Sequence, residues 1–183
     1  MEFEIIGWPE DDVSLELDYR VFPYAGKFVM TSTGKAVIRD TPTIIAALSF
    51  NEDRTDGERL WIRYWTVQRG YQGEGHGATL CQAFRQHATA AGYEDIRVAV
   101  NNPFAYEAAY RAGFGYTGEE TGIAELILST TSPRTTRLYH DGLARFQGRE
   151  GIDEDYVSRK QQATPPPIVT IPSSWKPGSH ESP

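Results

Sequence analysis

Four glycines crowd one short stretch of this chain, where they could bind an anion. The stretch, residues 67–80, reads VQRGYQGEGHGATL, and a β-rich apolar run leads through it into an amphipathic segment. Glycine tolerates positive φ and has no side chain, so several backbone N–H groups can converge on one phosphate. A helix that starts here adds its unpaired first-turn N–H groups and partial positive charge. Arg69 adds a full positive charge, and the stretch therefore predicts a phosphate-binding loop.

A strand and a helix are expected to hold this loop. Residues 58–67 form the longest β-rich run, and their aromatic side chains indicate a central strand. Strict alternation along the strand puts three large side chains on one face: Trp61, Arg63 and Trp65. From Gly75 onward the apolar residues follow a helical period, with Gln82 among the positions that face water and Gly92 as the left-handed cap.

A second strand and helix follow in the same order. Residues 95–100 predict a strand, after which Asn102 caps a helix. A Gly-Phe pair at residues 113–114 ends that helix. Residues 115–122 and 123–128 alternate enough to form two last strands.

The part of the chain before the central strand predicts three further strands and one helix. Residues 3–8 can form a strand, and residues 15–24 place apolar side chains at helical spacing. Residues 35–39 and 43–50 are β-branched and apolar, and the turn sequence Asp-Thr-Pro between them predicts an antiparallel hairpin. The whole order indicates a mixed α/β (α+β) fold, a sheet with helices packed on it.

The composition changes after Thr130. We therefore divide the chain into a domain of residues 1–130 and an extension of residues 131–183. Acidic residues early and basic residues late in residues 152–162 match the dipole of one short helix. The proline-rich end cannot form regular structure, but it is apolar enough to dock on the domain or on a partner subunit, with Trp175 as its anchor.

Composition and charge exclude several classes of protein. The net charge of −7 argues against a nucleic-acid binder, which needs clustered Lys and Arg. No apolar run approaches the ~20 residues that cross a bilayer, and the N-terminus lacks the pattern of a signal peptide, so a cytoplasmic protein is expected. The four histidines lack metal-ligand spacing, and the single cysteine, Cys81, is expected to be buried. The 14 Arg against 4 Lys, together with the acidic net charge, suggest a salt-adapted microbial host, and ordinary compositional drift explains them equally well.

These motifs together resemble those of the GNAT superfamily of N-acetyltransferases. Its acetyl-CoA loop has the form Gln/Arg-x-x-Gly-x-Gly/Ala between a strand and a helix, and QGEGHG at residues 72–77 satisfies it. The asparagine after the next strand and the Gly-Phe pair after the next helix stand at the family's separation. The resemblance covers residues 2–129 and implies a mixed, mostly antiparallel sheet with helices on both faces and acetyl-CoA as co-substrate. It assigns the cofactor to Val67, Arg69, Gln72, Gly73, Glu74, Gly75, His76, Gly77 and Asn102.

The sequence departs from the family pattern at the catalytic positions. The family commonly has a tyrosine four residues before the Gly-Phe glycine, and Ala109 stands there. Tyr110 and Tyr106, the phenols on that helix, are the candidates for the acid that protonates the departing thiolate. The family also often uses a glutamate on the central strand as base, and residues 60–67 contain no carboxylate.

Three functions fit these observations. The first is an N-acetyltransferase in which a small-molecule or peptide amine attacks acetyl-CoA directly in a ternary complex, with a homodimer left open. The second is a non-catalytic acyl-CoA-binding or sensor module, favoured by the missing carboxylate and the displaced tyrosine. The third is a dinucleotide site, which the GEGHGA run resembles, although the acidic residues that follow precede the next strand instead of ending it.

Overall fold

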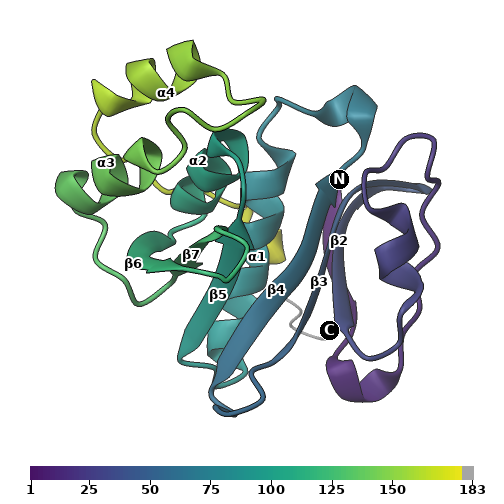
Figure 1. The fold of residues 1–183 in the computed structure, drawn as a ribbon. Coiled ribbons are helices and arrows are strands. Elements are labelled where there is room, and N and C mark those ends of the chain that lie inside the picture. Colours follow the sequence, from purple (N-terminus) through teal and green to yellow (C-terminus); the bar gives the residue numbers. More distant parts are fainter. Residues whose placement is uncertain (179–183) are drawn as a thin grey trace.

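The computed structural model of this protein describes residues 1–178, which form one open sheet with helices and long loops around it (Figure 1). The strands are β1 Glu2–Gly7, β2 Gly34–Asp40, β3 Thr43–Glu52, β4 Arg59–Val67, β5 Asp95–Val100, β6 Gly115–Glu120 and β7 Leu126–Ser129. Their order across the sheet is β1-β2-β3-β4-β5-β7-β6, so β4 is central, as expected. Among these paired strands only β4 and β5 run parallel, which confirms the predicted mixed, mostly antiparallel sheet.

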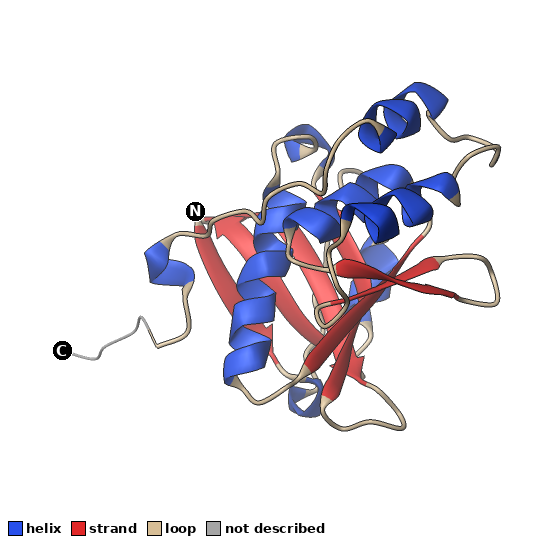
Figure 2. Cartoon of the chain, turned by 90° about the vertical axis from the view of Figure 1, so that its left-hand side faces the viewer, coloured by secondary structure: helices blue, strands red, loops and turns tan. Residues whose placement is uncertain are grey.

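Four α-helices accompany the sheet: α1 His76–Ala90, α2 Pro103–Arg111, α3 Thr136–Ala144 and α4 Glu154–Gln161. Helix α1 lies along one face of the sheet (Figure 2), where Cys81, Phe84 and Ala88 are fully buried. Gln82 was expected to face water, but only 7 % of it is exposed, because its side chain lies where α1 meets neighbouring elements and accepts a hydrogen bond from Arg85. No helix in residues 1–178 is long and apolar enough to span a membrane.

The opposite face of the sheet is covered by an irregular segment, residues 13–29, and the helix predicted for residues 15–24 is wrong. Leu15 and Leu17 both pack against a small buried cluster on this face, a spacing of two that suits extended backbone. Asp18 then turns the chain, since its carboxylate accepts hydrogen bonds from the backbone N–H and the Nε of Arg20 (both 2.9 Å). A short 3-10 helix, Ala25–Val29, completes this cover.

A buried lysine fastens the same segment to the sheet. Lys35, on β2, has no exposed surface, and its ammonium donates to the carbonyl oxygens of Val13 (2.8 Å), Met30 (2.6 Å) and Thr33 (2.7 Å). Burial lowers the pKa of Lys35 from its ordinary value. Three carbonyl acceptors offset the cost of burying this charge, and they hold the loop in place.

The hairpin of β2 and β3, strand β5 and the caps of α2 confirm the sequence predictions. Asn102 accepts a hydrogen bond from the N–H of Ala105 (2.9 Å), and Gly113 has a positive φ of 93° at the other end of the helix. The last strand is shorter than predicted. Residues 121–125 form a turn instead, and Ile123 is 80 % exposed.

Residues 131–178 pack on the rest of the chain. Helix α4 confirms the predicted short helix, whereas the sequence did not reveal α3, in which Tyr139 and Leu143 are fully buried. The proline-rich end, called the C-terminal arm (residues 165–178), lies against the domain. The ring nitrogen Nε2 of His87 is hydrogen-bonded to the backbone carbonyl oxygen of Trp175 (2.7 Å). Only 9 % of Trp175 is exposed, and it belongs to the core cluster, so the arm lies on its own chain with Trp175 at the contact.

Candidate functional site

The site begins where the parallel strands β4 and β5 separate. Their last paired residues are Ile62 and Val98, although β4 continues to Val67. The N–H and C=O groups of a strand point alternately to its two neighbouring strands. Beyond Ile62, the N–H and C=O groups of β4 on the side of β5 therefore have no partner strand. This opening leaves room for a ligand between the two strands.

A β-bulge at Arg63 accompanies the separation. Tyr64 pairs with Ser49 and Ile62 pairs with Phe50, so Arg63 is the extra residue on β4. The bulge shifts the alternation, and the expectation that Trp61 and Trp65 share a face is therefore wrong. Trp65 faces α1, where its ring N–H donates to the carbonyl oxygen of Gly77 (3.1 Å), while Trp61 donates to Asp53 on the other side.

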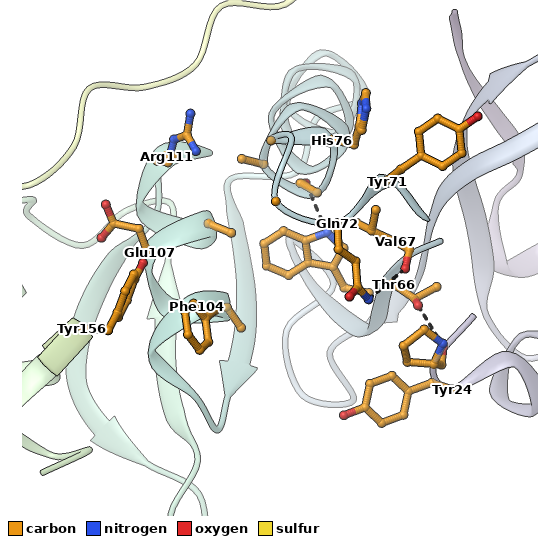
Figure 3. Close-up of a pocket in the computed structure, with 18 residues that line it drawn as sticks. Tyr24, Thr66, Val67, Tyr71, Gln72, His76, Phe104, Glu107, Arg111 and Tyr156 are labelled. Atoms are coloured by element: carbon orange, nitrogen blue, oxygen red, sulfur yellow. Dashed lines mark hydrogen bonds between the residues drawn. The ribbon is translucent and has the colours of Figure 1, made fainter. Parts of the chain in front are cut away.

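The opening leads into a pocket of about 690 Å³, called the first pocket, between β4, the start of α1 and helix α2 (Figure 3). Most of the lining is apolar or aromatic, including Trp65, Val67 and Phe104. Six of the residues predicted from the sequence line it: Val67, Gln72, Gly73, Gly75, His76 and Gly77.

Backbone donors in the glycine loop, residues 72–77, line one end of the first pocket. Gly73 and Gly75 have positive φ (84° and 86°), and Gly75 is the N-cap of α1. The first helical hydrogen bond is that from the N–H of Thr79 to the carbonyl oxygen of Gly75. Within residues 1–178, the six N–H groups of residues 73–78 donate to no protein acceptor. Such a run of free donors at a helix N-terminus suits a phosphate.

The positive charge at this loop comes from a residue that the sequence analysis missed. Arg69 does not line the pocket, because its guanidinium is turned toward the N-terminal segment and donates to the carbonyl oxygen of Arg20 (2.6 Å). Arg111, at the end of α2, lines the pocket from the opposite side, with its Nη2 3.9 Å from where a Cβ of Gly75 would lie. No motif marks Arg111, since only the folding of α2 beside α1 brings it to the loop.

Two other predicted residues lie beside the first pocket and do not line it. The carboxylate of Glu74 is turned to the His76 ring (3.1 Å), and Asn102 caps α2 and lines a neighbouring cavity. His76 itself lines the pocket and meets the ring of Tyr71 edge-on.

The structure does not bring Tyr106 or Tyr110 to the first pocket. Both are fully buried, and burial raises the pKa of both phenols. The Tyr106 hydroxyl donates to the carbonyl oxygen of Tyr139 (2.9 Å), and the Tyr110 oxygen accepts from the N–H of Tyr116 (2.9 Å). These contacts make them structural groups between α2, α3 and β6, so the geometry gives no support to an acid role for either.

Three other phenols line the first pocket: Tyr24, Tyr71 and Tyr156. Tyr156 comes from α4, contacts the ring of Phe104 (4.5 Å between centroids), and its pKa is raised to about 12 by burial. Tyr24 projects from the irregular segment, on the opposite wall (Figure 3), and is the only one of the three that also lines the neighbouring cavity. The sequence could not indicate Tyr24, because its segment was predicted as a helix.

The backbone around Tyr24 is held by the end of β4. The Thr66 hydroxyl donates to the carbonyl oxygen of Pro23 (2.8 Å), and the N–H of Arg69 donates to that of Val21 (2.8 Å). Tyr24 itself has a left-handed conformation (φ 60°) that is costly for a residue with a side chain. The fold therefore holds the backbone of Tyr24 at the edge of the pocket, while 58 % of the residue is exposed.

The neighbouring cavity, called the second pocket, has a volume of about 210 Å³ and lies in the opening between β4 and β5. It shares Tyr24, Trp65 and Ala105 with the first pocket. Two charged side chains line it, Arg63 and Glu125. A ligand in each pocket would meet at the shared residues.

Comparison with known proteins agrees with this architecture. Residues 2–116 match the acetyltransferase (GNAT) family. An IAA acetyltransferase from Bacillus cereus has a similar structure (TM-score 0.52, 18 % identity, covering 69 % of this chain and 96 % of that one). An acetyltransferase from Bacillus subtilis, solved in complex with CoA, also has a similar structure (TM-score 0.53, 14 % identity, covering 70 % of this chain and 96 % of that one). No relative was found among curated protein sequences. At such low identity the structural likeness shows the fold alone, but the family match spans more than half of the sequence, and the chain therefore belongs to the acetyltransferase (GNAT) family.

Proposed function

We propose that this protein transfers the acetyl group of acetyl-CoA to an amine by direct attack in a ternary complex. The observation that carries the proposal is the run of six N–H groups at residues 73–78 that have no protein acceptor within residues 1–178. They line one end of a pocket that shares residues with the cavity in the β4–β5 opening. This arrangement suits a ligand with a pyrophosphate at one end and a reactive group at the other. The Bacillus subtilis structure of similar fold was solved with CoA, which supports the same choice of ligand.

Each of the two pockets would bind one of the two substrates. Acetyl-CoA would occupy the first pocket, with its phosphates on the glycine loop and its thioester near Trp65 and Ala105, which the second pocket shares. A neutral amine in the second pocket then attacks the carbonyl carbon; the C–N bond forms, the C–S bond breaks, and sulfur leaves as a thiolate. The nitrogen loses one proton, and the thiolate gains one.

Turnover with a panel of amines tests this function. Acetyl-CoA is mixed with the full-length protein and small amines, diamines, amino acids or peptides, and both free thiol and acetylated product are measured. Acetylated product that requires the protein supports the proposal. Tight binding of acetyl-CoA without product from any acceptor would refute it and favour the acyl-CoA-binding module.

Replacement of Arg111 by glutamine is expected to weaken CoA binding by about tenfold or more. Hydrogen bonds from a charged donor contribute ~1.5–3 kcal/mol, and the guanidinium faces the glycine loop without an ion-pair partner among residues 1–178. Calorimetry at two salt concentrations measures the change, and the variant should show the weaker salt dependence. Arg137→Gln is the matched control, since Arg137 is 92 % exposed on α3. Equal affinities for the wild type and the Arg111 variant would place the phosphates elsewhere.

Replacement of Tyr24 by phenylalanine is expected to lower kcat by roughly 10²-fold, with little change in CoA affinity. Tyr24 is the phenol shared by the two pockets, so we assign it the proton that the thiolate receives. Steady-state kinetics with a fixed acceptor give kcat and KM separately. Tyr19→Phe on the same segment is the control, because Tyr19 is 78 % exposed and lines neither pocket. An unchanged kcat in the Tyr24 variant would show that Tyr24 does not supply the proton.

A further inference from the structure

The second pocket contains two opposite charges that do not pair with each other. Arg63 and Glu125 both line it, and neither takes part in an ion pair within 4.0 Å among the described residues. The other polar side chains that line this pocket are Tyr24, Tyr64, Trp65, Asn101 and Asn102. Arg63 interacts with the charge of Asp53 only beyond ion-pair distance, so its guanidinium and the Glu125 carboxylate can each bind a group of opposite charge on one ligand.

We infer that the acceptor is a small amino acid, a zwitterion whose carboxylate is bound by Arg63 and whose amino group lies on the side of Glu125. This inference rests on the proposed acetyl transfer and names its acceptor. An amine without a carboxylate would leave the Arg63 guanidinium unpaired beside it, and a diamine would place a second cation against it. The amino acid satisfies both charges of the pocket.

Arg63 is held in position before any ligand arrives. Its Nε donates to the side-chain oxygen of Asn51 on β3 (2.6 Å), and its guanidinium lies 5.4 Å from the ring centre of Trp61. Its two terminal nitrogens have no hydrogen-bond partner within residues 1–178, and these are the atoms that form a bidentate pair with a carboxylate. Partial desolvation lowers the pKa of Arg63, although the side chain stays accessible to solvent.

The β-bulge explains why an arginine on a central strand reaches this pocket. Arg63 is the extra residue of β4, at the point where the pairing of β4 with β5 ends. A bulge redirects the side chain of the inserted residue. Arg63 therefore stands beside the second pocket, one residue before Tyr64 and two before the shared Trp65.

The volume of the second pocket limits the size of the acceptor. At about 210 Å³ it lies below the ~300 Å³ at which pockets for drug-sized ligands begin. A single amino acid fits such a space. The carboxylate also orients the acceptor, because binding it to Arg63 fixes which end of the molecule faces the thioester.

Each amino acid and its amide provide a matched pair of acceptors. The two have nearly the same shape, but the amide lacks the carboxylate charge, and its amino group is the weaker base, so more of it is neutral at a given pH. If availability of the neutral amine alone decided the rate, the amide would react faster. We expect the opposite: for the best amino acids in a panel of the twenty, kcat/KM should exceed that of the amide by at least about tenfold, mainly through KM.

Variants of Arg63 show whether this preference comes from the guanidinium. Arg63→Gln should reduce the ratio of kcat/KM for acid over amide to about one, and Arg63→Lys should restore part of it, because lysine keeps the charge and loses the planar fork. Arg54→Gln is the control, because it removes a nearby charge that lines neither pocket. The ratio of kcat/KM for acid over amide should stay unchanged in this variant. Melting temperature and CoA affinity establish that each variant is folded.

The outcomes separate this inference from the proposed function. Efficient acetylation of amines that lack a carboxylate, or an acid-over-amide ratio that survives in a folded Arg63→Gln protein, would overturn the amino-acid acceptor and leave acetyl transfer intact. Absence of product with every amine in spite of acetyl-CoA binding would overturn acetyl transfer and this inference with it. A ratio that falls only in the Arg63 variants supports both.

Discussion

A Gly75→Val protein is expected to lose CoA affinity by 10²-fold or more while it remains folded. Gly75 has a φ of +86°, which a β-branched residue adopts only with strain, and its own N–H belongs to the run of free donors. The new side chain would stand between the loop and Arg111, at the place where a phosphate must approach the backbone. Calorimetric titration with CoA measures the loss.

Gly92→Val provides the matched control at the other end of the same helix. Gly92 also has a positive φ, of 102°, and a Cβ there would meet no atom within 4 Å. Both substitutions therefore impose a similar backbone strain of roughly 1–2 kcal/mol, but only the first lies in the first pocket. Unchanged CoA affinity in Gly75→Val, or an equal loss in both proteins, would contradict the assignment of the glycine loop.

A chain that ends at Thr130 is expected not to fold cooperatively. Six residues beyond this point belong to the same core as α1 and the sheet: Tyr139, Leu143, Phe146, Val157, Ile171 and Trp175. Each such side chain contributes about 1.5–3 kcal/mol when buried, and their sum is comparable to the ~5–15 kcal/mol that stabilises a whole domain. Circular dichroism during heating should show no sharp transition.

A chain that ends at Thr164 is the control for this truncation. It keeps α3 and α4 and lacks residues 165–183, which include the C-terminal arm, so it should melt cooperatively at a lower temperature than the full chain. The sequence predicted a self-contained domain at residues 1–130. If the chain that ends at Thr130 melted cooperatively and bound CoA as well as the full chain, residues 1–130 would be a self-contained domain, and our expectation would be contradicted.

The sequence predicted the fold well where local signals agree with tertiary packing. The change from β to helical periodicity at Gly75, the cap at Asn102 and the left-handed Gly113 all reflect short-range chemistry, and the structure contains each of them. The early helix failed because Leu15 and Leu17 pack on the sheet as extended chain, a contact that helical spacing cannot reveal. Helix α3 was missed for the same kind of reason, since its sequence is polar except on the side that meets Tyr106.

The candidate site was predictable only in its glycine loop. That loop is local in sequence, whereas the other walls of the pocket come from segments that meet only in the folded chain: Tyr24, Arg111 and Tyr156. The family resemblance placed Tyr106 and Tyr110 near the site, but their hydroxyl groups bond to α3 and β6 in the core. The bulge at Arg63 could not be predicted from the sequence. A bulge is recognised by its pairing with the neighbouring strand, and the pairing of β3 with β4 is known only from the structure.

Acetylation of Lys35 would report whether a molecule of this protein has unfolded locally. Acetyl-CoA acetylates exposed lysines slowly without any enzyme, and the attacking amine must be neutral and reachable. The Lys35 amine has no exposed surface and donates hydrogen bonds to three carbonyl oxygens, so acetyl-CoA cannot reach it in the folded protein. An acetyl group found on Lys35 would therefore mark a molecule that had opened between β2 and the segment above it, whereas acetylation of an exposed lysine would carry no such information.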